Sequence, residues 1–335
     1  SQWGQREAEQ RRNAMRDTPA SIAASTNASA PTPALRRHAS VHTFRIRVVA
    51  TPAYQAQILS WQQDLQAIID QANEILEPEL GARLQVVSVH TWHPSVSEQS
   101  LSELRQALIA MDSGEDVDWV VGLAGSVPTA TDRFDQIGQA SMLGKHWVQR
   151  AATRLGEHDA VEQSFDELKD TERAALMRKR KKHRAVAVFL HELGHTLGGL
   201  HERDEHSLMH ARYDPRMTSF GEQDTELMRI SLAHRAKAQD ARAQASLARE
   251  LLATLEPLPA DRWEPKEKEH MLAYLRGLAT HEAPKPPASA AAVSSAQAQV
   301  WGGAPVPAEQ QQEIARISEL VRARKLREAW TAIRP

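Results

Sequence analysis

The chain has no cysteine among its 335 residues. Disulfide bonds therefore cannot stabilise its fold, and its compartment cannot be inferred from cysteine usage. Long hydrophobic runs are missing as well, because no apolar stretch approaches the roughly 18 residues of a membrane-spanning helix. With 41% hydrophobic and 25% charged residues, the composition is ordinary for a globular protein.

The chain also lacks an excess of one charge sign, since 41 Lys and Arg oppose 43 Asp and Glu for a net charge of −2. No overall field would draw it to nucleic acid or to an anionic membrane. Locally, acidic residues around 166–172 precede a basic run at 178–184. We expect a long helix in 157–184 that packs beside the helix that follows, since acidic residues first and basic residues last suit the helix dipole. No aromatic residue interleaves with the basic run, so we interpret that run as a solvated helix face and not as a nucleic-acid site.

Composition divides the chain into five parts. Residues 1–40 are charged and then rich in Pro, Ala and Ser, so we expect a disordered tether or pro-segment. Residues 41–235 should form the main domain and 236–283 a helical extension. A Pro/Ala/Ser linker is expected at 284–308, before a helical segment at 309–335. No signal peptide is visible.

Hydrophobic periodicity places strands and helices alternately along the main domain. Strands are expected at 44–49, 84–89 and 119–123, with helices at 58–76 and 101–111 between them and further helices near 227–235, 236–256 and 266–278. Strands that alternate with helices predict an α/β fold with a mostly parallel sheet.

The stretch from His191 to His201 carries the candidate chemistry, and the apolar run 185–190 leads into it as a buried helix. Residues four apart lie on one face of a helix, so His191 and His195 can present two imidazole nitrogens to one metal ion. Glu192 would lie beside a metal-bound water. This H-E-x-x-H arrangement predicts two zinc ligands and a general base.

A third ligand follows at the right distance. Gly198 comes three residues after His195, and because glycine tolerates a left-handed backbone the helix can end there and His201 can return to the same metal. Three imidazoles and one water make the open site of a single catalytic zinc ion. A fourth ligand would close that site, so His206 and His210 are interpreted as surface or outer-shell residues.

The complete pattern H-E-x-x-H-x-x-G-x-x-H resembles the signature of the metzincin clan of zinc endopeptidases. The resemblance implies a catalytic domain with a mixed, mostly parallel sheet (α/β, or α+β), an active-site helix and a methionine turn under the metal, which Met209 fits. It also implies a protein or peptide substrate and an exported enzyme, extracellular, periplasmic or at the cell surface. The thiolate that keeps some metzincins latent is excluded here.

Residues after the motif leave the subfamily open. Glu202 follows the third ligand, as in astacins, yet astacins place the methionine further on and a tyrosine two residues after it, where this chain has Ala211. The short spacing from the third histidine to the methionine is closer to that of matrixins, and archaemetzincins carry cysteines near this site. A gluzincin-type site would take Glu222 or Glu226 as third ligand, a role that the third histidine fits better.

Two further features are candidates by position. Gly138, Ala140 and Met142 fall where metzincins keep an antiparallel edge strand above the cleft, which could pair with an extended peptide; an ordinary edge strand is the alternative. Tyr213 is near enough in sequence to reach the cleft as a transition-state stabiliser, although it does not match the astacin position. The alternative for Tyr213 is a packed tyrosine.

The predicted function is that of a zinc-dependent endopeptidase. Zinc would lower the pKa of its water from about 15.7 to about 7, Glu192 would take the proton and pass it to the leaving amine, and Met209 would pack under the imidazoles. Two alternatives remain open. One is a catalytically silent, zinc-stabilised module that binds a protein partner through its C-terminal helices, and the other is a hydrolase of a non-protein amide. The retained Glu192 favours an enzyme.

Overall fold

The computed structural model describes residues 40–126, 131–151, 170–237 and 241–280. Contacts along the chain separate residues 1–283 from residues 284–335, and the fold below is that of the first unit. The predicted segments 1–40 (apart from Ser40), 284–308 and 309–335 lie outside the described residues, so the domain boundaries stay a prediction. Among the described helices, none combines the length and the apolar character needed to cross a membrane.

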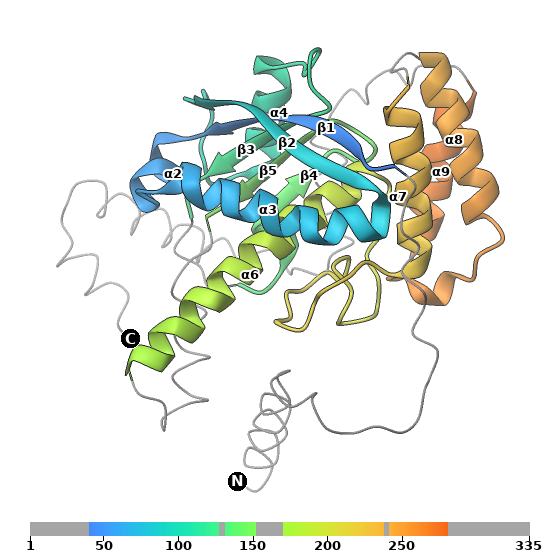
Figure 1. Cartoon of the computed structure of the whole chain (residues 1–335). Helices are drawn as coiled ribbons and strands as arrows, with labels where there is room; N and C mark the ends of the chain where they lie inside the picture. The colour runs from blue at the N-terminus through green and yellow to red at the C-terminus, as the bar shows by residue number, and fades with distance from the viewer. Residues whose placement is uncertain (1–39, 127–130, 152–169, 238–240, 281–335) are drawn as a thin grey trace, which may run out of the picture. The chain divides into compact units, whose positions relative to one another are not determined.

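A five-stranded sheet forms the centre of the fold, in the order β2-β1-β3-β5-β4 (Figure 1). Its strands are β1 (His42–Ala50), β2 (Ala82–Thr91), β3 (Trp119–Ala124), β4 (Gly138–Ala140) and β5 (His146–Arg150). All neighbours pair in parallel except β4, which runs antiparallel to β5. The mostly parallel α/β sheet predicted from the alternating pattern is confirmed.

Helices cover both faces of this sheet and continue beyond it. They are α2 (Pro52–Gln57), α3 (Trp61–Leu80), α4 (Leu101–Met111), α6 (Asp170–Thr196), α7 (Glu222–Arg235), α8 (Ala241–Leu255) and α9 (Glu267–Ala279), with single 3₁₀ turns at Phe134–Gln136 and Ala260–Arg262. The predicted helix 58–76 begins at Trp61 and ends with Gly81 in the left-handed conformation at φ 65°, which glycine adopts without a steric penalty.

Side-chain alternation divides the core into two layers. Val121 and Trp147 point to the face covered by α3 and α6, whereas their neighbours Val120 and Val148 point to the face covered by α4. Strand β3 is buried on both faces and reads as a continuous apolar run, whereas β2 and the first half of β1 alternate between buried and exposed residues. Figure 1 shows α3 and α6 on one side of the sheet and α4 on the other.

The structure corrects one expectation about the long helix. A separate helix in 157–184 was predicted to pack beside the catalytic one, but residues 170–184 form the first half of α6 itself, and residues 152–169 lie outside the described part. No proline or glycine interrupts the sequence between Asp170 and Leu193, so nothing breaks the helix before the histidines. The basic run is therefore continuous with the helix that carries the metal motif.

A second correction concerns the edge strand. Strand β4 ends at Ala140, because the amide of Gly144 donates to the carbonyl of Ser141 at 2.8 Å and closes a turn. Met142 lies in that turn and packs with the helices of the extension rather than continuing the strand. The predicted segment therefore holds the edge strand β4, the turn, and the buried strand β5.

Candidate active site

Helix α6 delivers two of the three histidines on its last turns. His191 and His195 stand one helical turn apart, and their Nε2 atoms are 3.1 Å from each other. The helix ends at Thr196, and Gly198 adopts φ +90°, so the chain reverses where the sequence predicted. The amide of Gly199 then donates to the carbonyl of Gly194 at 2.9 Å, which closes the helix end.

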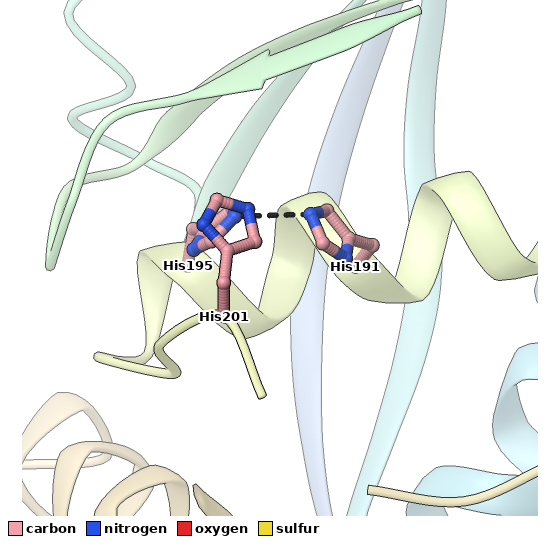
Figure 2. Close-up of side chains that lie close together, drawn as sticks. All are labelled: His191, His195 and His201. Carbon is pink, nitrogen blue, oxygen red and sulfur yellow. Dashed lines mark hydrogen bonds between the residues drawn. The ribbon is translucent and has the colours of Figure 1, made fainter. Parts of the chain in front are cut away.

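His201 returns to the same place, and the three imidazoles converge (Figure 2). Their candidate ligand nitrogens all lie within 4.8 Å of one another, and the residues described contain no other such group of His, Cys, Asp or Glu. The ring centroid of His201 lies 5.2 Å from that of His191 and 4.7 Å from that of His195. Three nitrogen donors around one point are a donor set that suits zinc.

Hydrogen bonds orient each imidazole through its Nδ1 atom. His191 Nδ1 lies 2.8 Å from the carbonyl oxygen of Leu208, and His195 Nδ1 lies 2.9 Å from that of Gly199. His201 Nδ1 lies 3.2 Å from Glu267 Oε1, a carboxylate oxygen. Since every one of these partners is an acceptor, Nδ1 carries the proton and donates in each ring. The Nε2 lone pairs are thus left for a metal.

Burial also keeps the rings of His191 and His195 uncharged. It lowers the pKa of His191 well below the ordinary value, and the charges of His195 and His201 lower it further. Burial, followed by the charge of His201, lowers the pKa of His195 to about 4. A metal ligand must be neutral imidazole, so this environment favours binding of a cation over binding of protons near neutral pH.

Glu192 follows the first histidine and is buried, with 2% of its surface exposed. Burial raises the pKa of its carboxyl well above the ordinary value, while the charge of Arg105 and the backbone amide of Ala140 lower it in part. Its Oε2 atom has no hydrogen-bond partner among the described residues. A buried carboxylate with one uncommitted oxygen beside three histidines has the properties of a proton acceptor.

The loop after His201 packs against the end of the helix that carries the first two histidines. The amide of Met209 donates to Ser207 Oγ at 3.0 Å, and the amide of Glu202 donates to the carbonyl of Met209 at 3.0 Å. Met209 is fully buried, and a methyl group on Gly199 would lie 3.1 Å from its Cε atom. The methionine side chain therefore fills the space against the end of the ligand helix.

Tyr213 packs against helix α6 and the turn that holds Phe134. Its hydroxyl lies 2.9 Å from Nδ1 of His183, which precedes His191 by eight residues on α6, about 12 Å along the helix axis. Its ring meets Phe134 edge-on with centroids 6.5 Å apart, and Phe134 in turn stacks on His191 at 4.2 Å. In this structure the tyrosine hydroxyl is committed to the upstream half of the helix.

The other candidate ligands lie outside the histidine group. His206 is exposed beside Asp204, and Nδ1 of His210 lies 3.0 Å from the carbonyl oxygen of Glu202. Glu222 and Glu226 are both exposed on α7. The described group of potential metal ligands holds His191, His195 and His201 alone.

Three residues near the site carried no signal in the sequence. Phe134 packs on the first histidine and Glu267 contacts the third, 66 positions further along the chain. Arg105, on α4, donates to Ser141 Oγ at 2.9 Å and acts electrostatically on Glu192. None belongs to a motif, and only the tertiary fold brings them here.

Comparison with known proteins gives one family match. Residues 62–202 match the family described as metallo-peptidase family M12B, reprolysin-like. This region runs from α3 to the residue after the third histidine, and so includes all three histidines and Glu192. Among curated proteins no sequence matches the chain.

Several solved structures resemble the chain at low identity. An archaemetzincin from Methanopyrus kandleri is 22% identical over 57% of this chain and 96% of its own, with a TM-score of 0.39. An archaemetzincin from Archaeoglobus fulgidus is 14% identical over 55% of this chain and 99% of its own, with a TM-score of 0.31. Metalloproteinase-II from Bacteroides fragilis is 15% identical over 56% of this chain and 53% of its own, with a TM-score of 0.35.

Proposed function

We propose that this chain, a zinc metallopeptidase of the metzincin clan, is an endopeptidase that uses a zinc-activated water and Glu192 as general base. The family match over residues 62–202 confirms the resemblance drawn from the histidine pattern. The observation that carries the proposal is the buried carboxylate of Glu192, which has one oxygen without a hydrogen-bond partner and lies on the helix that also carries two of the three converging histidines.

His191, His195 and His201 would hold the zinc ion, and the bound ion would act as a Lewis acid that lowers the pKa of its water to about 7. The chain's own residues then set the proton transfer. Burial raises the pKa of Glu192, which makes its carboxylate a stronger proton acceptor than one in water. Glu192 accepts the proton of the attacking water and returns it to the leaving amine.

Strand β4 supports the proposal that the substrate is an extended peptide. It is the edge strand of the sheet, and Ser141 N and Ile137 O, at its two ends, bond to β5. Residues at alternate positions of a strand bond to the same side, so the backbone groups of Gly138 and Ala140 point away from β5, where the amide of Ala140 also bonds to the Glu192 carboxylate. An antiparallel substrate strand could add there and place a bond inside the peptide, rather than its end, at the histidines.

The test is a digest of a proteome-derived peptide library with wild type and Glu192→Ala, read by mass spectrometry of the new termini. Glu226→Ala, which removes an exposed carboxylate of α7, is the matched control. We expect internal cleavages by wild type and by the control. In Glu192→Ala the rate should fall by at least about 10²–10⁴-fold, with zinc content unchanged, because Glu192 is not a ligand.

Each other outcome contradicts a stated part of the proposal. Release of terminal residues alone would make the protein an exopeptidase. A wild type that holds zinc and cleaves nothing would favour the zinc-stabilised binding module, or a hydrolase of a non-protein amide. If Glu192→Ala held zinc and cleaved as fast as wild type, Glu192 would not be the general base.

A further inference from the structure

We propose that Glu267, from the C-terminal helical extension, is the positioning residue of the third zinc ligand, so that the extension completes the metal site. The inference rests on the proposed zinc site. Glu267 Oε1 lies 3.2 Å from Nδ1 of His201, and the backbone amide of His201 also donates to the Glu267 carboxylate. Both groups are largely buried, with 11% and 15% of the two side chains exposed.

The two neighbouring ligands show what is different about His201. His191 and His195 donate to the carbonyls of Leu208 and Gly199, which belong to the ligand helix end and the loop after it. Both acceptors lie within 17 residues of the histidines that they orient. His201 alone donates to a carboxylate, and that carboxylate comes from a helix 66 residues away.

The extension also fixes the backbone of the ligand segment. The amide of Glu264 donates to the carbonyl of His201 at 2.9 Å, and the amide of Arg203 donates to the carbonyl of Arg262 at 3.0 Å. Glu202 and Trp263 form the bridge between these two bonds. The chain just after the third ligand is therefore paired, residue by residue, with the chain just before α9.

A buried cluster holds this pairing in place. Trp263 is fully buried, and its Nε1–H donates to Asp224 Oδ1 at 3.2 Å. The same oxygen lies 3.3 Å from the amide of Leu200, the residue before the third ligand. Leu200 and Trp263 share one apolar core with Leu251, Leu255 and Leu275 from α8 and α9. Burial of these side chains, typically about 1.5–3 kcal/mol each, docks the extension on the ligand segment.

Further residues on one face of α9 also contact the segments around the site. Glu267 and Met271 are four residues apart and therefore adjacent on that face. Glu267 meets His201, and Met271 Cε would lie 3.3 Å from a methyl group on Gly198. One turn further, the hydroxyl of Tyr274 lies 3.4 Å from the carbonyl of Met142. Helix α9 thus borders the site from its third ligand to the turn after β4.

A carboxylate that accepts from Nδ1 fixes the ring and makes Nε2 more basic. Removal of such an outer partner typically weakens metal binding about 10–100-fold. We expect Glu267→Gln to weaken zinc binding by about tenfold, since it keeps an acceptor oxygen but loses the charge. Glu267→Ala, which loses both, should approach the 100-fold end of that range.

The experiment measures zinc affinity of the full chain by competition with a chromogenic chelator, without any peptide substrate. The variants are Glu267→Gln, Glu267→Ala and His201→Ala, with Glu269→Gln as the matched control, because Glu269 is exposed on the same helix. The absorption spectrum of the cobalt-substituted protein reports ligand geometry separately. We expect the Glu267 variants to show both weaker binding and an altered cobalt spectrum, and the control to match wild type.

Outcomes separate this inference from the proposed function. If the wild type binds no zinc, the proposed function fails and the inference fails with it. If wild type binds zinc, His201→Ala weakens binding and Glu267→Gln equals wild type in affinity and spectrum, only the positioning role is overturned. Should Glu267→Ala fail to fold, Glu267→Gln decides, because it is nearly isosteric. Urea unfolding of the metal-free protein verifies that it folds.

Discussion

Gly138 of strand β4 lies directly against the carboxyl group of Glu192 on α6. A methyl group on Gly138 would stand 2.6 Å from Cδ of Glu192 and 2.7 Å from its Cγ, well inside van der Waals contact. Glycine is needed here for the close approach of strand and helix. The edge strand and the general base therefore constrain each other's position.

From this relationship we predict that Gly138→Ala impairs catalysis without removing the metal. The added methyl must push the carboxylate away from the water or lift β4 from α6, and a misplacement of about 1 Å can lower a rate about 10²-fold. The zinc ligands do not contact Gly138 in any described interaction, so zinc content should stay at the wild-type level. Initial cleavage rates and metal analysis of the same preparations provide the test.

Gly277→Ala is the control for Gly138→Ala, because nothing lies within 4 Å of a methyl group at that position of α9. This variant should cleave as fast as wild type. Glycine in a helix is about 0.5–1 kcal/mol less favourable than alanine, so the control should also be slightly more stable. Full activity of Gly138→Ala would show that β4 moves aside freely and that the base is not held by it.

We also predict that zinc stabilises the fold and that only the three converging histidines mediate this. A ligand that binds the folded state alone, at 100 times its dissociation constant, adds about 2.7 kcal/mol to the free energy of unfolding. A chelator should therefore lower the melting temperature of wild type, and added zinc should restore it. His195→Ala should abolish most of the difference between the two conditions, measured by thermal unfolding with and without the chelator.

His206→Ala is the matched control for that measurement, because His206 is exposed and lies outside the ligand group. It should keep the full difference in melting temperature. Loss of the zinc effect in His206→Ala would mean that a fourth histidine reaches the metal. That result would contradict the open coordination site on which the proposed hydrolysis depends.

The sequence predicts the part of the site that depends on local spacing. His191 and His195 face one way because a helix repeats every 3.6 residues, and Gly198 turns the chain because it lacks a side chain. The structure shows this arrangement, with the candidate ligand nitrogens of the three imidazoles within 4.8 Å of one another. The order of strands and helices along the chain likewise predicts the mostly parallel sheet, because strands that alternate with helices pair in parallel.

The remainder depends on contacts between distant segments, which spacing does not encode. Glu267 looks in sequence like any acidic residue at the start of a helix, where it suits the helix dipole. Only the docking of α9 shows that it accepts a hydrogen bond from His201. The sequence around Met142 predicts a continued edge strand, whereas the turn found there depends on the bond between Gly144 and Ser141.

The last prediction concerns Glu79, near the end of α3. Its Oε2 atom accepts a hydrogen bond from the amide of Phe220 at 3.1 Å, in the loop that leads to α7. Burial raises the pKa of Glu79 to about 7 from its ordinary 4.5, although the Phe220 amide and the charge of Arg229 lower it in part. The folded protein thus holds a proton on Glu79 at a pH where the unfolded chain has lost it.

Because the folded state binds this proton more tightly, Glu79 stabilises the fold most at low pH. Its contribution is complete below about pH 4.5 and is lost as the pH rises to about 7. Glu79→Gln keeps an acceptor for the Phe220 amide and carries no charge at any pH. We therefore expect the variant to match wild type near pH 5 and to be more stable at pH 8, by on the order of 1–2 kcal/mol after allowance for partial exposure.

Urea unfolding of wild type and Glu79→Gln at the two pH values measures this difference, and any pH dependence of zinc binding is common to both proteins. Glu74→Gln, an exposed carboxylate on the same helix, controls for the loss of one negative charge. If Glu79→Gln were the less stable protein at pH 8, the charged hydrogen bond to Phe220 and the attraction of Arg229 would outweigh desolvation. The ionised carboxylate would then fasten α3 to the loop before α7, and stability from this residue would rise with pH.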